Sequence, residues 1–476
     1  MQNIKSIMVP LAGPFIFLTV YFSNLDLTQK QQCFLAIFSF VVYNWLIAKI
    51  PLFATGLMGV SLSVVLGVKD ATTALSSFAH PIIFIFLAGF LFAKALRNIG
   101  LDKRISLFII SRKQVSKSFD RLLFCLLALC AFFSMWVSNT ATTAMMLPIM
   151  LGVLNSVGVK DKITQSYMLL GLAYSASVGG LATPVGSPPN IIAIGMLEQL
   201  AGIKITFLEW TLFGMPLSLF FLLIIYFFIK RKVPKEVRSI DLTKLFSETK
   251  EKKGLNSNEL WLMAMFSALL IAWFTPGLLK SAFGDVMPIF HTIQKRMNPG
   301  AVGVLLASLL FVFPLKSKTK LLETDDLRDI DWGSLILFGS GLSLGKMLFD
   351  TGLANIAGNF LVAQIAGTGV FLFLLLLCLF TVFSTELASN TASANILIPI
   401  VIASSTSLGL GPAAAAIAVA LSCSLAFMLP VATPPNAIVY GSGKVEISTM
   451  MRFGLVLNFV CGTSLALVFY FIKYAL

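Results

Sequence analysis

The chain has 476 residues, of which 57% are hydrophobic and only 12% are charged, and its mean hydropathy is +0.91. Since a soluble domain carries about 25% charged residues, this composition excludes soluble proteins and predicts a protein that crosses a membrane many times. The formal net charge of +14 does not indicate a nucleic-acid partner, because the basic residues gather between apolar segments, as the positive-inside rule produces.

Apolar segments follow one another along the whole chain. They occupy residues 7–23, 31–48, 52–68, 81–100, 122–157, 166–200, 211–229, 259–279, 300–315, 333–350, 367–408, 413–443 and 453–472. The first has no small-residue cleavage site behind it, so residues 1–30 are interpreted as an N-terminal segment with a first span, not as a cleaved signal. We predict an all-α polytopic membrane protein with about eleven transmembrane helices.

Two segments, 122–157 and 367–408, are too long for one span. Each is interrupted by a Ser-Asn-Thr triplet, which begins at Ser138 in the first and at Ser389 in the second. An arm of about 16 residues is too short to cross a hydrocarbon core of about 30 Å at about 1.5 Å per residue. We therefore predict two re-entrant hairpins, each of which enters and leaves the membrane on the same side.

Two further segments, 166–200 and 413–443, contain a Pro-Pro-Asn sequence in their interior. Proline lacks an N–H and clashes with the preceding turn, so each helix must break there. Ser187 and Thr433 are suitable N-caps, with Pro188 and Pro434 at the first helical position. Each segment is therefore predicted to be two half-helices joined by an unwound loop, which is tolerated at membrane depth only where it lines a cavity or is buried in protein.

The hairpins and broken helices recur in the same order about 250 positions apart. We predict a first repeat over 31–229, a charged cytoplasmic linker over 230–258 and a second repeat over 259–476. Basic residues favour an N-terminus in the cytoplasm, and an odd number of crossings then places the C-terminus outside. One hairpin would open inward and the other outward, so the repeats are inverted, a common plan of secondary transporters.

The repeated motifs offer hydroxyls, amides, carbonyls and helix N-termini but no ionisable side chain. Asn139 and Asn390 present amide oxygens that suit Na⁺, and the N-termini of the second arms suit carboxylates. Four helix N-termini, each worth at most about half a positive charge, together with two sodium ions would balance a dianion. A proton-coupled carrier would usually place an acidic residue or histidine in the pathway, so sodium coupling is favoured.

Paired Ser-Asn-Thr hairpins and paired Pro-Pro-Asn loops resemble those of the divalent anion:sodium symporter family, over residues 30–472. The resemblance implies a homodimer of scaffold and transport domains that works by an elevator mechanism. It implies two sodium sites, one at Ser134, Ser138, Asn139 and Gly186, the other at Thr385, Ala388, Asn390 and Ala432. It also implies substrate-binding residues, namely Asn139, Thr140, Ser187, Pro188, Asn390, Thr391, Thr433 and Pro434.

The function expected from the residues and the resemblance is sodium-coupled import of a C4-dicarboxylate such as succinate, malate or fumarate. Two or more co-transported Na⁺ ions, a dianionic carboxylate and the lipid bilayer of the cell's inner (plasma) membrane are the expected partners, and no nucleic acid is expected. A dicarboxylate exchanger and a sodium-coupled citrate or sulfate transporter remain alternatives. An intramembrane enzyme is disfavoured because no histidine or paired carboxylate accompanies the serines, and a channel because the hairpins predict an occluded site.

Three other features lie outside these motifs. Glu386 is close to the second triplet, but the corresponding residue of the first repeat is Met135, so we interpret Glu386 as structural. Lys94 and Lys346 occupy equivalent positions and are expected to extend towards the membrane interface. The resemblance also implies that residues 101–121 form an inner arm helix and residues 352–367 an outer one.

Overall fold

The computed structural model describes residues 2–240, 242–243, 254–284, 296–312, 320–364, 369–405, 407 and 409–472. Within these residues all regular secondary structure is helical, as predicted. The α-helices are α1 (Gln2–Phe22), α2 (Gln29–Ile47), α3 (Leu52–Val65), α4 (Ala71–Ser76), α5 (Pro81–Ile99), α6 (Leu101–Ile110), α7 (Lys113–Ser116), α8 (Phe119–Ser134), α9 (Asn139–Val157), α10 (Lys162–Gly179), α11 (Pro188–Ala201), α12 (Phe207–Lys232), α13 (Lys235–Arg238), α15 (Ser257–Phe283), α17 (Pro299–Leu309), α18 (Trp332–Asp350), α19 (Leu353–Gln364), α20 (Gly369–Leu387), α21 (Asn390–Ser404), α22 (Pro412–Cys423), α23 (Pro434–Gly441) and α24 (Ile447–Ile472). Two short 3-10 helices accompany them, η1 (Ser77–Ala79) and η2 (Thr324–Asp329).

Seven helical stretches in the described part of the chain are long and apolar enough to cross a membrane. They are Ala71–Ile99, Asn139–Val157, Phe207–Lys232, Ser257–Phe283, Trp332–Asp350, Gly369–Leu387 and Ile447–Ile472. Shorter apolar helices, among them α3 and α17, accompany them. The chain is thus built as a multi-pass membrane protein, and the predicted number of about eleven crossings stays a prediction.

The two predicted hairpins form, with their turns at the Ser-Asn-Thr triplets. Helices α8 and α9 make the first hairpin, and α20 and α21 make the second. Arms α8 and α21 have 16 and 15 residues, but α9 and α20 have 19 each. The predicted arm length is wrong for these two, because α9 continues to Gly158 and α20 stays helical up to Leu387, directly before the turn. A 19-residue arm spans about 28 Å at about 1.5 Å per residue, so arm length does not establish re-entry, which stays a prediction.

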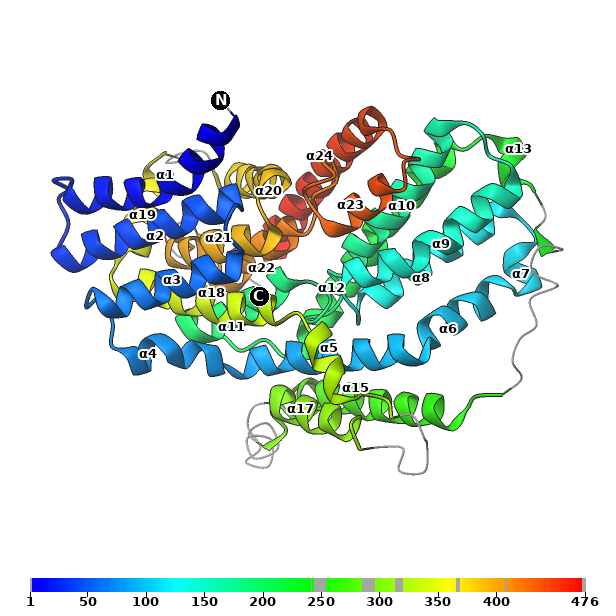
Figure 1. Cartoon of the computed structure of the whole chain (residues 1–476), viewed down its shortest axis with the longest axis horizontal. Helices are drawn as coiled ribbons and strands as arrows, with labels where there is room; N and C mark the ends of the chain where they lie inside the picture. The colour runs from blue at the N-terminus through cyan, green and yellow to red at the C-terminus, as the bar shows by residue number, and fades with distance from the viewer. Residues whose placement is uncertain are drawn as a thin grey trace.

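Both predicted broken helices break at the expected places. The first is α10 followed by α11, and the second is α22 followed by α23, each pair joined by an unwound loop. The second half of each broken helix crosses to the other repeat: α11 packs against α21 and α22, whereas α23 packs against α9 and α10 (Figure 1). The two repeats are therefore interlocked, and each hairpin is covered by a half-helix from the opposite half of the chain.

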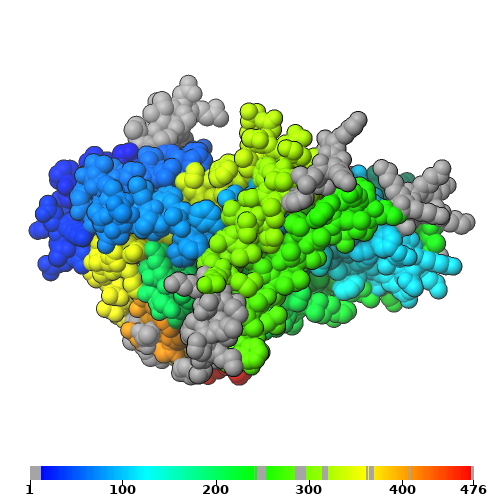
Figure 2. Space-filling model, turned by 90° about the horizontal axis from the view of Figure 1, so that it is seen from below, coloured from blue at the N-terminus to red at the C-terminus, as the bar shows by residue number. Residues whose placement is uncertain are grey.

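The helices around the hairpins also pack against helices of the other repeat. Helix α5 packs against α17, and its counterpart α18 packs against α3. Figure 2 shows α15 and α17, in green, lying across one face between the N-terminal helices in blue and the α6–α8 region in cyan. In the predicted linker, residues 241 and 244–253 lie outside the described residues, as do residues 367, 368, 406 and 408 of the predicted second hairpin.

The predicted inner arm differs from the structure. It is two short helices, α6 and α7, and residues 119–121 already belong to the hairpin arm α8. The break follows Ile110, where Ser111 and Arg112 leave the helix. Helix α6 is joined to α15 by an ion pair in which Arg104 Nη1 lies 2.5 Å from a carboxylate oxygen of the buried Glu259. The described part of the predicted outer arm is a single helix, α19, and residues 365–367 lie outside the described residues.

The expectation that Lys94 extends towards the membrane interface stays a prediction, but the structure shows what its ammonium group contacts. Its Nζ lies 2.5 Å from an Asp329 oxygen and 3.4 Å from an Asp326 oxygen. The charge of the two carboxylates holds the ammonium group between them. Both carboxylates belong to η2, which lies next to the last turns of α5. Lys94 therefore ties α5 to η2.

Candidate substrate and cation site

In the first repeat, oxygen atoms converge at the tip of the hairpin. The hydroxyl of the buried Ser134 donates to Oδ1 of Asn139 at 2.5 Å. The amide position of Asn139 that faces Ser134 also lies 3.2 Å from the carbonyl oxygens of Ala176 and Gly186. With Oδ1 inward, four oxygens face one another, which is a donor set that suits a hard cation such as Na⁺. With the amide turned over, Nδ2 would donate to the same three oxygens.

The second repeat has a similar group of atoms. Oγ1 of the buried Thr385 lies 2.6 Å from Oδ1 of Asn390 and 3.1 Å from the carbonyl oxygen of Cys423. Ala388 and Ala432, the other residues predicted here, are also buried. The pair Thr385 and Asn390 thus repeats the pair Ser134 and Asn139, as the sequence predicted.

The remaining predicted residues lie at the ends of four helices. Ser138 is the N-cap of α9, where its hydroxyl accepts the Ala141 N–H, and Thr140 lies exposed in the first turn. Thr391 is buried in the first turn of α21. Thr433 caps α23 by accepting the Asn436 N–H, and Pro434 is the first residue of that helix, as predicted.

Ser187 departs from the prediction. It occupies the N-cap position of α11 before Pro188, but its side chain makes no capping hydrogen bond. Its hydroxyl instead lies 2.8 Å from the hydroxyl of Ser424 in the loop of the second repeat. Both residues are buried, and one hydroxyl donates to the other across the boundary between the repeats. This contact was not predicted, because Ser424 lies outside every motif.

The Ser187–Ser424 contact links the two oxygen groups. On one side Ser187 follows Gly186, whose carbonyl faces Asn139. On the other side Ser424 follows Cys423, whose carbonyl bonds to Thr385 and so leads to Asn390. The two hairpin tips are therefore connected through a short run of residues that crosses from one repeat to the other at the Ser187–Ser424 contact.

Two asparagines that were not predicted as site residues fix the unwound loops. Nδ2 of Asn190 donates to the carbonyls of Gly180 and Thr183, at 2.8 Å each. Nδ2 of Asn436 donates to the carbonyls of Ala426 and Leu429, at 3.1 Å each. The signal was present in the sequence, since asparagine ends both Pro-Pro-Asn copies.

Glu386 has a structural position, in line with its interpretation. Its Oε1 accepts the backbone N–H groups of Phe427 and Met428 at 2.6 and 2.8 Å, and its Oε2 accepts that of Leu429 at 3.0 Å. Nδ2 of Asn458 in α24 donates to Oε1 at 2.7 Å. All four partners are donors, so the buried carboxylate holds the loop of the second repeat rather than facing the hairpin tips.

The electrostatics of the site come from the backbone. Helices α9, α21, α11 and α23 all begin at the residues described above, so their positive ends are close to the oxygen groups. Within the described residues, no cluster of three or more His, Cys, Asp or Glu side chains could hold a metal ion. Oxygen groups of this kind suit small monovalent cations, and helix N-termini with nearby hydroxyls suit an anion.

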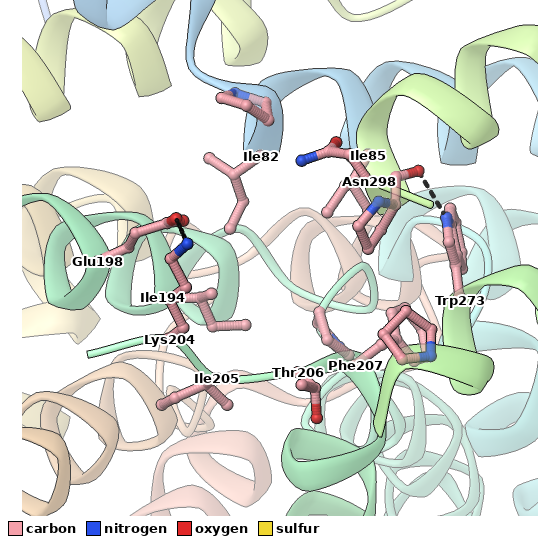
Figure 3. A pocket seen from close by; sticks show the side chains of 14 residues that line it. Ile82, Ile85, Ile194, Glu198, Lys204, Ile205, Thr206, Phe207, Trp273 and Asn298 are labelled. Atoms are coloured by element: carbon pink, nitrogen blue, oxygen red, sulfur yellow. Dashed lines mark hydrogen bonds and ion pairs between the residues drawn. The ribbon is translucent and has the colours of Figure 1, made fainter. Parts of the chain in front are cut away.

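A separate cavity of about 550 Å³ lies between α5, α15, α17 and the connection from α11 to α12 (Figure 3). Isoleucines form much of its wall, and the ion pair of Glu198 and Lys204, 3.8 Å apart, lies at one side. Pro184 of the first unwound loop also lines it. None of the predicted binding residues does, so this cavity was not foreseen.

Comparison with known proteins bears on these features. Residues 2–473 match a family model described as the sodium:sulfate symporter transmembrane region. The chain is 35% identical over 452 residues to an uncharacterized transporter of Haemophilus influenzae, covering 94% of the chain and 92% of that protein. It is 30% identical over 489 residues to the sodium-dependent dicarboxylate transporter SdcS of Staphylococcus saprophyticus, covering 99% and 92%.

Two solved structures share the fold at low sequence identity. The YdaH transporter of Alcanivorax borkumensis matches with a TM-score of 0.55 and 15% identity, over 84% of this chain and 88% of that one. MtrF of Neisseria gonorrhoeae, from a class of antimetabolite efflux pumps, matches with a TM-score of 0.51 and 12% identity, over 95% and 97%. Polytopic helical transporters therefore share the overall arrangement of this chain.

Proposed function

Because the chain belongs to the sodium:sulfate symporter family, also called the divalent anion:sodium symporters, we propose that it imports C4-dicarboxylates such as succinate, malate or fumarate together with Na⁺. The family consists of transporters, so the chain is not an enzyme. The choice of a dicarboxylate follows the relatives named sodium-dependent dicarboxylate transporter.

One observation carries the proposal. Two oxygen groups, around Asn139 and Asn390, are linked through the Ser187–Ser424 contact and lie at the N-termini of four helices. Oxygen ligands suit sodium, and helix N-termini with hydroxyls suit carboxylates. Two sodium ions beside a dianion would leave the bound complex close to neutral, so no basic side chain is required in the membrane.

The proposed ligand sets follow the repeats. The first sodium ion takes Ser134, Ser138, Asn139 and Gly186, and the second takes Thr385, Ala388, Asn390 and Ala432. The dicarboxylate lies between them, against the hydroxyls and amides of the hairpin tips and the starts of α11 and α23. The carbonyl of Ala176, which faces Asn139, is an added candidate ligand of the first ion.

We further propose the transport cycle and assembly that the sequence suggested. The hairpins re-enter the membrane, the N-terminus is cytoplasmic and the C-terminus is outside. The hairpins and broken helices form a transport domain that moves against a scaffold of the peripheral helices in a homodimer. The interlocked packing of α11 on α21 and of α23 on α9 supports the movement of these elements as one body.

The experiment that tests this function is uptake into proteoliposomes. Purified protein should accumulate labelled succinate under an inward Na⁺ gradient, and replacement of Na⁺ by choline should reduce uptake to the background of protein-free liposomes. Unlabelled malate and fumarate should compete strongly, and citrate and sulfate weakly. Uptake that continues unchanged in choline would contradict sodium coupling, and competition by sulfate alone would contradict the substrate class.

A further inference from the structure

Asn190 and Asn436 make the same set of contacts in the two repeats. Each is the third residue of its half-helix, α11 or α23, and each is fully buried. Each donates through Nδ2 to two carbonyls of the preceding unwound loop, and the two acceptors are seven and ten residues upstream in both repeats. A geometry that recurs in two halves with different loop sequences, "GLATPVGS" and "AFMLPVAT", indicates a shared role.

Each amide acts only as a donor. Oδ1 of Asn190 and Oδ1 of Asn436 are both buried and have no hydrogen-bond partner among the described residues. The amides cannot be turned over, because that would place Oδ1 against two carbonyl oxygens. Leaving a buried acceptor unpaired is unfavourable, so the two N–H contacts to the loop must outweigh it in both repeats.

These contacts fix the turn that carries a proposed sodium ligand. The carbonyl of Thr183 accepts both Asn190 Nδ2 at 2.8 Å and the Gly186 N–H at 3.3 Å. The carbonyl of Leu429 likewise accepts both Asn436 Nδ2 at 3.1 Å and the Ala432 N–H at 3.2 Å. Gly186 and Ala432 are the loop residues whose carbonyls are assigned to the two ions.

The second carbonyl held by Asn190 belongs to Gly180, which packs tightly against the first site. A methyl group on Gly180 would lie 2.7 Å from Asn139 Oδ1 and 2.8 Å from the Gly186 carbonyl oxygen. A shift of Gly180 therefore displaces both Asn139 and Gly186. Asn190 therefore holds, through its Gly180 contact, a residue that packs against both the hairpin tip and the loop.

We propose that Asn190 and Asn436 are positioning residues for the cation sites, each setting the carbonyl geometry of the sodium site in its own repeat. The inference rests on the proposed function and adds to it the residues that shape the two sites. Loss of either side chain should weaken sodium binding at one site and leave the other intact.

The test measures sodium binding without transport. Purified full-length protein in detergent is titrated with NaCl at constant ionic strength, with choline chloride as the balancing salt, and thermal unfolding is followed at each concentration. Ligand binding to the folded state raises the unfolding temperature, so the titration gives a sodium midpoint. Asn190→Leu and Asn436→Leu keep the shape of the side chain but remove both donors. Each should raise the midpoint about tenfold or more and lower the cooperativity of the sodium response.

Asn155→Ala is the matched control. Asn155 is an asparagine near the end of α9 whose Oδ1 accepts from Lys444, away from both loops, and its replacement should leave the sodium midpoint unchanged. Asn190→Ser and Asn436→Ser give the same comparison if a leucine variant does not fold. If a leucine variant unfolds at a lower temperature in choline but keeps the wild-type sodium midpoint, the positioning role is wrong. The proposed function would still stand. Wild-type protein that is not stabilised by Na⁺ at all would overturn both.

Discussion

Replacement of Asn139 by alanine is expected to reduce sodium-driven succinate uptake about 10–100-fold at a fixed Na⁺ concentration, and Asn390→Ala should do the same. In the proposed cation sites each asparagine supplies the central oxygen ligand, with Ser134 or Thr385 beside it. An interaction with a charged partner is worth about 1.5–3 kcal/mol, and each 1.4 kcal/mol is about tenfold in affinity. Uptake by both variants should be measured as a function of Na⁺ concentration in proteoliposomes.

Asn139→Asp separates the two roles of this residue. The aspartate keeps an oxygen at the ligand position, so sodium binding should survive, but its added negative charge repels a dianion. Sodium should then still stabilise the protein against thermal unfolding, whereas succinate uptake should fall. If Asn139→Ala and Asn390→Ala both kept the wild-type sodium dependence of uptake, the assignment of the two oxygen groups as cation sites would be wrong.

Replacement of Glu386 by glutamine is expected to have the largest effect on stability, at about 1.5–3 kcal/mol, because hydrogen bonds to a buried charged acceptor are lost. The carboxylate accepts three backbone N–H groups of residues 427–429 and the amide of Asn458. A glutamine carries an NH₂ group in place of one carboxylate oxygen. That NH₂ group would then face at least one N–H donor that the oxygen had accepted from. The change should lower the thermal unfolding temperature and reduce the amount of folded protein in the membrane.

Glu198→Gln is the matched control for this prediction. Glu198 is partly exposed and its Lys204 partner is 3.8 Å away, so removal of its charge should change stability by less than about 1 kcal/mol. Glu386→Gln protein that unfolded at the wild-type temperature would show that the carboxylate is not needed to hold the loop. The two variants can be compared in one fluorescence-detected thermal unfolding series.

The positions at which helices break were predictable from local chemistry. Pro188 and Pro434 cannot continue a helix that arrives from upstream, whatever surrounds them, so α11 and α23 begin where the sequence indicates. The triplets were equally informative, because Asn139 and Asn390 are the first residues of their arms in the structure. Comparison of the two repeats showed that Met135 stands where the second repeat has Glu386. This predicted a structural role for Glu386, and the structure agrees.

Contacts between distant segments were not predictable in this way. Ser187 has the same local sequence as a capping serine, yet its hydroxyl pairs with Ser424 because the two loops meet face to face. Lys94 forms ion pairs with Asp326 and Asp329, which the sequence around Lys94 does not indicate. In both cases the local pattern is compatible with either outcome, and only the tertiary neighbours decide between them.

The crossing of α11 and α23 into the opposite repeats has a consequence for how the protein could be divided. If the polypeptide were cut in the linker and the two fragments produced in separate cells, each fragment would hold a hairpin without its covering half-helix. Neither fragment alone could then assemble a complete binding chamber. Transport should be restored only when both fragments are produced in the same membrane. The smallest functional unit therefore contains both halves of the chain.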